Sequence, residues 1–158
     1  MCGITGNFGF KEELKFSKHL KDVEPLLQRR GPDQLNIINI DNFYAAHSRL
    51  IVQGDSEDGI QPMKYQNIVI LFNGNLYNKD SLKSRLESYG YIFKGVSDTE
   101  VVAISVFHWG LNAFNKFNGF FSIASYDSHK RTLTLARDRV GQKPLYYSVN
   151  QKSVFFGS

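Results

Sequence analysis

Residues 119–138, GFFSIASYDSHKRTLTLARD, hold two strand-like runs in succession, GFFSIASYD and TLTLARD, with no helical segment between them. Short runs of the same kind recur along the chain, rich in the β-branched and aromatic residues that are typical of strands. They are residues 4–10, 36–40, 43–52, 67–72, 91–95, 144–149 and 153–158. Because few helices alternate with these runs, the sequence predicts an α+β fold with antiparallel sheets rather than a parallel doubly wound sheet.

Apolar residues at helical spacing indicate a helix over residues 11–30, between the first two strand-like runs. Pro25 is expected to break or kink this helix, because proline lacks an N–H donor and its ring clashes with the preceding turn. The Gly31-Pro32 pair then stops the helix.

Two more helices are expected at residues 78–91 and 97–110. Ser97 and Glu100 have the three-residue spacing of a capping box at the start of the second. Asp98 would then be the first helical residue, where a carboxylate suits the helix dipole. A substrate-binding role for Asp98 needs support from elsewhere.

The composition describes a folded chain of 158 residues, about the size of one domain, because 42% of it is hydrophobic and 14% aromatic. One cysteine excludes an intrachain disulfide, and the four scattered histidines predict no metal site. The net charge is +4, but Lys and Arg alternate with acidic residues along the predicted helices, which disfavours nucleic-acid binding.

No segment has the features of a membrane anchor or a leader. The longest mostly apolar run, VVAISVF, is far shorter than the roughly 20 residues that cross a bilayer. No basic region precedes an apolar stretch at the N-terminus, as it does in a signal peptide. We therefore expect a cytoplasmic protein with no membrane partner.

Cys2 is the single thiol, and a lone cysteine is usually an inert apolar residue. Its position after the initiator Met1 suggests another role, since Met is commonly trimmed before a small residue. Cys2 would then carry a thiol together with a free α-amine, whose pKa is about 7.7–8.0 in general. A nucleophile and its general base would be combined in one residue. Gly3 has no side chain to hinder the approach of substrate or backbone.

Asn73-Gly74 follows an apolar run, and two interpretations are open. Asn-Gly is the strongest short signal for a type I′ hairpin turn. Alternatively, the Asn73 side-chain amide and the Gly74 N–H form an oxyanion hole. Arg49, in an apolar strand-like context, is either a bidentate clamp for a substrate carboxylate or half of an ion pair.

Eight motifs occur in order: MCGITG, RRGPDQ, AHSRLIV, QPM, FNGNLYN, SDTE, GFFSIASYD and RDRVGQKPLYY. Together they resemble the glutaminase domain of class II glutamine amidotransferases, most closely the asparagine-synthetase branch. The resemblance covers essentially residues 1–158 as a single domain. It implies the N-terminal nucleophile hydrolase fold, a four-layer αββα sandwich of two antiparallel sheets.

The resemblance assigns catalysis to three residues. Cys2 is the nucleophile, and Asn73 and Gly74 form the oxyanion hole. The Cys2 amine, directly or through water, takes the thiol proton; the thiolate attacks the glutamine δ-carbonyl and ammonia departs. Water then hydrolyses the γ-glutamyl thioester to release glutamate.

Five further residues receive substrate-binding or supporting roles by the same resemblance. Arg49 holds the glutamine α-carboxylate, Asp98 the α-ammonium, and backbone around Val52 lines the pocket. Asparagine synthetases usually have Glu at the position of Asn75, whereas Asn-Gly-Asn is familiar from amidophosphoribosyltransferases. The missing carboxylate leaves Asp98 more exclusively responsible for the ammonium. Arg30 helps to order the site around Cys2.

The implied function is release of ammonia from L-glutamine for an asparagine-synthetase-like amide-forming partner domain or subunit. A Ser-Gly-Gly-x-Asp-Ser pyrophosphate loop is absent from the sequence. No cofactor is therefore expected on this chain, with ATP and Mg²⁺ confined to a separate synthetase domain. Two alternatives are a non-catalytic glutamine-binding regulatory module and an N-terminal-nucleophile amidase with another substrate.

Overall fold

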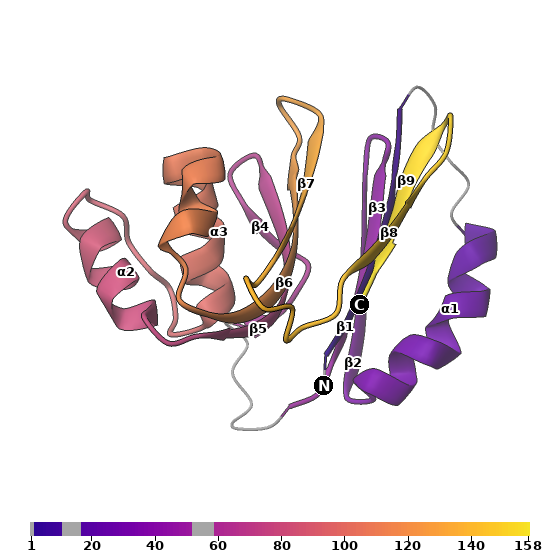
Figure 1. Ribbon diagram of the computed structural model, residues 1–158, viewed down its shortest axis with the longest axis horizontal. Coiled ribbons are helices and arrows are strands. Elements are labelled where there is room, and N and C mark those ends of the chain that lie inside the picture. Colours follow the sequence, from indigo (N-terminus) through magenta and orange to yellow (C-terminus); the bar gives the residue numbers. More distant parts are fainter. Residues whose placement is uncertain (1, 11–16, 52–58) are drawn as a thin grey trace. The chain divides into compact units, whose positions relative to one another are not determined.

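The computed structural model describes residues 2–10, 17–51 and 59–158 (Figure 1). The chain forms two compact units, Met1–Asp55 with Pro144–Ser158, and Ser56–Lys143. Each unit is built around one antiparallel sheet that has a helix or helices on one of its faces.

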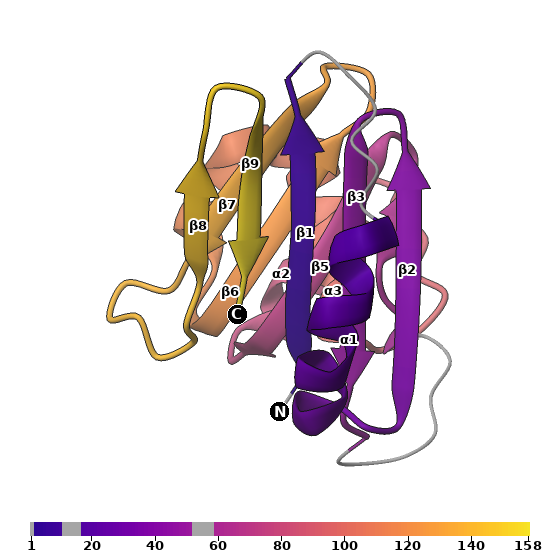
Figure 2. The same cartoon turned by 90° about the vertical axis from the view of Figure 1, so that its right-hand side faces the viewer.

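The first unit contains a five-stranded sheet in the order β2-β3-β1-β9-β8, with every neighbouring pair antiparallel. Helix α1 (Ser17–Arg30) contacts β1 and β3, and Figure 2 shows it in front of that part of the sheet. The strands are β1 (Gly3–Gly9), β2 (Gln34–Ile40), β3 (Phe43–Arg49), β8 (Tyr146–Val149) and β9 (Ser153–Gly157).

The second unit contains a four-stranded antiparallel sheet in the order β4-β5-β6-β7. Alternate β5 residues Ile68, Ile70 and Phe72 pack in one core with apolar residues of α3, because the strand period of two places them on the same face. The elements are β4 (Met63–Tyr65), β5 (Ile68–Leu76), α2 (Lys79–Glu87), α3 (Asp98–Trp109), the 3₁₀ helix η2 (Gly110–Lys116), β6 (Gly119–Asp127) and β7 (Thr132–Arg137).

The predicted α+β class with antiparallel sheets is confirmed, but the strand expected at residues 91–95 is wrong. This segment connects α2 to α3, and its backbone donors are taken locally. Tyr91 N–H donates to the Leu86 carbonyl at 3.2 Å. Lys94 and Gly95 N–H donate to the Glu100 carboxylate at 2.8 and 2.9 Å. With these donors engaged, apolar composition alone does not make a strand.

One expectation holds in part and one interpretation is wrong. Helix α1 continues through Pro25, so the helix is not broken there, and Figure 1 shows it bending along its length, which agrees with the expected kink. The Pro25 side chain is exposed, so its ring does not disturb the face that packs through buried Leu27. Asn73-Gly74 is not a hairpin turn: it lies inside β5 and pairs with β6. The expected helical start at 11–16 lies outside the described residues.

Candidate active site

Cys2 immediately precedes β1, at the end of the strand where Arg49 ends β3. The β1–β3 pairing reaches Gly3 with Ser48 and Ile4 with His47, and Cys2 and Arg49 are the next residue on each side. A Cβ built on Gly3 would lie 2.7 Å from Ser48 Oγ and 3.1 Å from Leu27 of α1. The Gly3–Ser48 pair therefore faces α1, and alternation along β3 directs Arg49 to the other face.

Hydrogen bonds from three side chains hold the main chain around Cys2. Gly3 N–H donates to Ser48 Oγ at 3.1 Å, and Ile4 N–H donates to Ser158 Oγ at 3.1 Å. The Arg30 Nη2 group, from the last turn of α1, donates to the Cys2 carbonyl at 3.3 Å. The start of β1 is thereby anchored to β3, to the helix and to the end of β9.

The segment after α1 fits closely against the backbone of Arg49. A Cβ on Gly31 would lie 2.6 Å from Arg49 N, so the close approach requires glycine. Asp33 N–H donates to the Arg49 carbonyl at 3.1 Å, and the Asp33 carboxylate accepts from Ile51 N–H at 2.6 Å. Sequence analysis assigned Gly31 only to the helix stop and gave Asp33 no role, so it missed their contacts with the Arg49 and Ile51 backbone. The Gly-Pro-Asp succession after the helix was the available signal.

His47 was set aside with the other scattered histidines, yet it lies on the same sheet face as Arg49. Its side chain is 1% exposed, and neither ring nitrogen has a hydrogen-bond partner in the described part of the chain. Burial, followed by the Arg49 charge, lowers the pKa of His47 to about 4. The imidazole is therefore neutral at physiological pH.

In the second unit, Asn73 and Gly74 lie in β5 beside β6. A Cβ on Gly74 would lie 2.2 Å from the Phe120 carbonyl oxygen, so the strand pairing itself requires glycine. Asn73 is 4% exposed, and its side-chain Nδ2 has no hydrogen-bond partner within the described ranges. A buried, unpartnered N–H donor is costly to a fold and is what an oxyanion site needs.

The Gly74 N–H group lies on the edge of β5 that faces away from β6. Phe72 N–H and Leu76 N–H both donate to side chains outside the β5–β6 ladder, at 2.6 and 2.8 Å. Since N–H direction alternates along a strand, Gly74, midway between them, has the same direction. Asn73 and Asn75 have the opposite parity, and Asn75 is exposed.

Asp98 is the first residue of α3, which Ser97 caps by accepting from Glu100 N–H at 3.3 Å. Its carboxylate accepts from Leu76 N–H at 2.8 Å and lies 3.8 Å from Lys79 Nζ. Burial raises the pKa of Asp98, against the opposing effects of the Leu76 N–H and Lys79. The carboxylate therefore joins the end of β5 to the start of α3.

The predicted site residues fall into two groups. Cys2, Arg30 and Arg49 belong to the first unit, and the second holds Asn73, Gly74, Asn75 and Asp98. Val52 lies outside the described residues. Within the described ranges, no three His, Cys, Asp or Glu side chains are grouped so that they could hold a metal ion. Nor does any described helix have the length and apolar character to cross a membrane.

Residues 1–158 match the family described as "Glutamine amidotransferase domain". Asparagine synthetase [glutamine-hydrolyzing] 3 of Bacillus subtilis (strain 168) is 39% identical over all of this chain, which covers 26% of that protein. Asparagine synthetase B [glutamine-hydrolyzing] of Escherichia coli (strain K12) is 33% identical over 96% of this chain and 27% of its own length. The chain thus spans about a quarter of the length of these curated relatives.

A solved structure of glutamine phosphoribosylpyrophosphate amidotransferase from B. subtilis, complexed with ADP and GMP, matches with a TM-score of 0.79. The match covers 99% of this chain and 41% of that one, at 21% sequence identity. At this identity the likeness establishes the fold alone.

Proposed function

The chain belongs to the glutamine amidotransferase domain family, and from that premise we propose that it hydrolyses L-glutamine and supplies the ammonia to an amide-forming partner. The observation that supports this proposal is the β1–β3 register, which pairs Gly3 with Ser48 and so brings the next residues, Cys2 and Arg49, to the same end of the two strands. In the proposal, Cys2 is the nucleophile and Arg49 the cation that binds the substrate carboxylate.

The proposed reaction starts once Met1 is removed and Cys2 becomes the N-terminal residue. Its α-amine accepts the thiol proton, and the thiolate forms a bond to the δ-carbon of glutamine. The Asn73 Nδ2 and Gly74 N–H donors stabilise the resulting oxyanion. The C–N bond of the glutamine amide breaks as its nitrogen takes the proton from the Cys2 α-ammonium, so ammonia leaves. Water then attacks the γ-glutamyl thioester, releasing glutamate and restoring the thiol.

Substrate recognition in this proposal uses opposite charges at the amino-acid end of glutamine. The Arg49 guanidinium pairs with the α-carboxylate, and Asp98 pairs with the α-ammonium. Asn75 contributes a neutral polar group where asparagine synthetases usually have a carboxylate, so Asp98 provides the negative charge. Backbone around Val52 completes the pocket, and Arg30 orders the site through its bond to the Cys2 carbonyl.

The proposed partner is an asparagine-synthetase-like domain or subunit. The two asparagine synthetases above are about four times as long as the match, so most of each relative lies outside it. Amide formation, with its ATP and Mg²⁺, is assigned to that further part. This chain contributes the ammonia.

The test is an intact-mass measurement on the untagged chain before and after incubation with an electrophilic diazoketone analogue of glutamine. We expect loss of Met1 and one adduct, mapped by peptide sequencing to Cys2. Cys2→Ala should take no adduct and release no ammonia from glutamine while keeping the wild-type circular dichroism spectrum. A second variant that retains an N-terminal tag before Cys2 should also be inactive.

Three results would overturn parts of this proposal. Undiminished ammonia release from Cys2→Ala would remove Cys2 from the mechanism. Full activity of the tagged chain would exclude the free amine as the base. A trimmed chain that binds glutamine, takes no adduct and releases no ammonia in the presence of its partner would be a non-catalytic glutamine-binding module.

A further inference from the structure

The outer edge of β5 is left uncovered by β4 for its last residues. The β4–β5 pairing ends where Met63 meets Ile70. Beyond that point, the N–H groups of Phe72, Gly74 and Leu76 share one edge, because alternate residues of a strand direct their donors to the same side. These groups need partners other than a neighbouring strand.

Gln61, from the QPM motif, provides the partner for the first of them. Phe72 N–H donates to Gln61 Oε1 at 2.6 Å, and Gln61 Nε2 donates to Thr99 Oγ1 at 3.0 Å. Gln61 is 6% exposed and Thr99 4% exposed, so both bonds are buried. One side-chain amide thereby connects the strand edge to the first turn of α3, which packs on β5 (Figure 1).

Asp98 provides the partner for the last of them, through Leu76 N–H at 2.8 Å. Asp98 and Thr99 are adjacent in α3, so a single helix turn fixes β5 on both sides of Gly74. The Gly74 N–H itself is not engaged by any side chain in the described ranges. The edge therefore presents one available donor between two occupied ones.

We propose that Gln61 and Thr99 are positioning residues for this chain's glutaminase reaction, which hold the β5 edge so that Gly74 N–H is fixed in the direction of the developing oxyanion. The inference rests on the proposed function, in which Gly74 is an oxyanion donor. Such donors act only when they are preorganised, and a misplacement of about 1 Å can cost roughly 10²-fold in rate. Neither Gln61 nor Thr99 touches the substrate in this account.

The kinetic test uses glutamine with the full chain and its partner. Gln61→Met keeps the buried volume while removing both polar atoms, so kcat should fall about 10- to 100-fold. The KM for glutamine should stay within about twofold, because the oxyanion forms only in the transition state. Thr99→Val should lower kcat by a smaller factor of about 3 to 10, and Thr99→Ser, which keeps the hydroxyl, should restore it.

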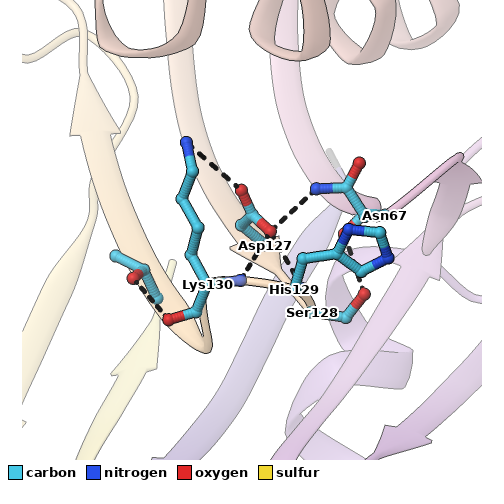
Figure 3. A network of polar contacts seen from close by, with 6 residues as sticks. Asn67, Asp127, Ser128, His129 and Lys130 are labelled. Atoms are coloured by element: carbon cyan, nitrogen blue, oxygen red, sulfur yellow. Dashed lines mark hydrogen bonds and ion pairs between the residues drawn. The ribbon is translucent and has the colours of Figure 1, made fainter.

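The matched control removes a hydrogen bond from the opposite end of β5. Asn67 Nδ2 donates to Asp127 Oδ1 at 2.8 Å, in the network of Figure 3. Asn67 lies seven residues from Gly74, roughly 23 Å along an extended strand. Asn67→Ala should therefore lower the urea midpoint without changing kcat. A kcat loss in Asn67→Ala equal to that in Gln61→Met would reduce Gln61 to a general stability role and overturn the proposal.

Amide hydrogen exchange by NMR separates this inference from the glutaminase proposal itself. In the wild type, Phe72 N–H should exchange slowly. In Gln61→Met and Thr99→Val, Phe72 exchange should accelerate at least tenfold and the Gly74 resonance should shift. If the wild type releases no ammonia, the glutaminase proposal fails and Gly74 has no oxyanion to serve. If it is active but these variants leave kcat, Phe72 exchange and Gly74 unchanged, the positioning role is wrong.

Discussion

The first turn of α3 and the loop after β7 each bind a strand backbone through one aspartate, with opposite effects on its ionisation. Asp138 is buried and accepts N–H bonds from Phe121, Gln142 and Lys143 at 3.2, 2.9 and 3.0 Å. Burial alone would raise the pKa of Asp138, but the N–H groups, led by Lys143 and Gln142, together lower it. At Asp98, burial outweighs one N–H bond and Lys79, and the pKa is raised.

These opposite pKa shifts distinguish Asp138, whose charge the fold already stabilises, from Asp98, which can still bind a cationic ligand. Backbone donors surround Asp138, so its charge is already stabilised by the fold. Within the described residues, Asp98 has one backbone donor and one lysine at 3.8 Å. An incompletely compensated carboxylate gains most from a further cation, as the ammonium of glutamine would provide.

The sharpest way to break this comparison is to neutralise Asp98. Asp98→Asn keeps an oxygen for Leu76 N–H but removes the charge, so the KM for glutamine should rise about 100-fold, the size of one charged hydrogen bond. Asp98→Ala should also lower kcat, because it releases the β5 edge beside Gly74. Steady-state ammonia release measures both constants. An unchanged KM in Asp98→Asn would make Asp98 structural, like Asp138.

Asp138 should respond in stability rather than in substrate binding. Asp138→Ala strands buried N–H groups and should lower the free energy of unfolding by about 2 kcal/mol, measured by urea denaturation. The KM for glutamine should remain within about twofold of the wild type in folded protein. A large KM increase without a loss of stability would contradict the structural assignment.

The two aspartates should also differ in how pH affects stability. The lowered pKa of Asp138 means that its ionised form stabilises the fold; this contribution is lost as pH falls below the ordinary value of 3.8. For Asp98 the raised pKa means that ionisation costs stability as pH rises above 3.8 through the raised value. On acidification, the free energy of unfolding of the wild type minus that of the variant should therefore fall for Asp138→Asn and rise for Asp98→Asn. Urea titrations between about pH 3 and 7 test this; parallel curves would contradict it.

The smallest expected effect concerns Lys79, whose ion pair with Asp98 would compete with the substrate ammonium in the proposed binding mode. Lys79→Met removes an ion pair that is partly exposed, so stability should change by less than about 1 kcal/mol. The KM for glutamine should fall about twofold, because Asp98 loses its internal cation. A KM that rises instead would show that Lys79 supports binding. Ammonia release at low glutamine concentration is the measurement.

Local sequence signals predicted much of the fold, because strand runs and helix caps depend on neighbours in the chain. Eight of the nine strand-like runs contain a strand, and each could be recognised from its own residues, yet 91–95 has the same composition and is not a strand. Its donors are captured by Leu86 and Glu100, which composition does not reveal. Ser97 did cap α3 as its spacing to Glu100 predicted.

The amino-acid sequence by itself determined the strand-rich α+β class, the cap at Ser97 and, through its ordered motifs, the candidate residues of the site. Tertiary structure decided what those residues do locally. Asn73-Gly74 lies inside a strand rather than in a turn, and at Gly74 the neighbouring Phe120 and Phe121 of β6 leave no room for a Cβ. Gln61 reached Phe72 and Thr99 across 11 and 38 residues of sequence. Hydrogen bonds over such separations depend on chain folding and leave no periodic trace in the sequence.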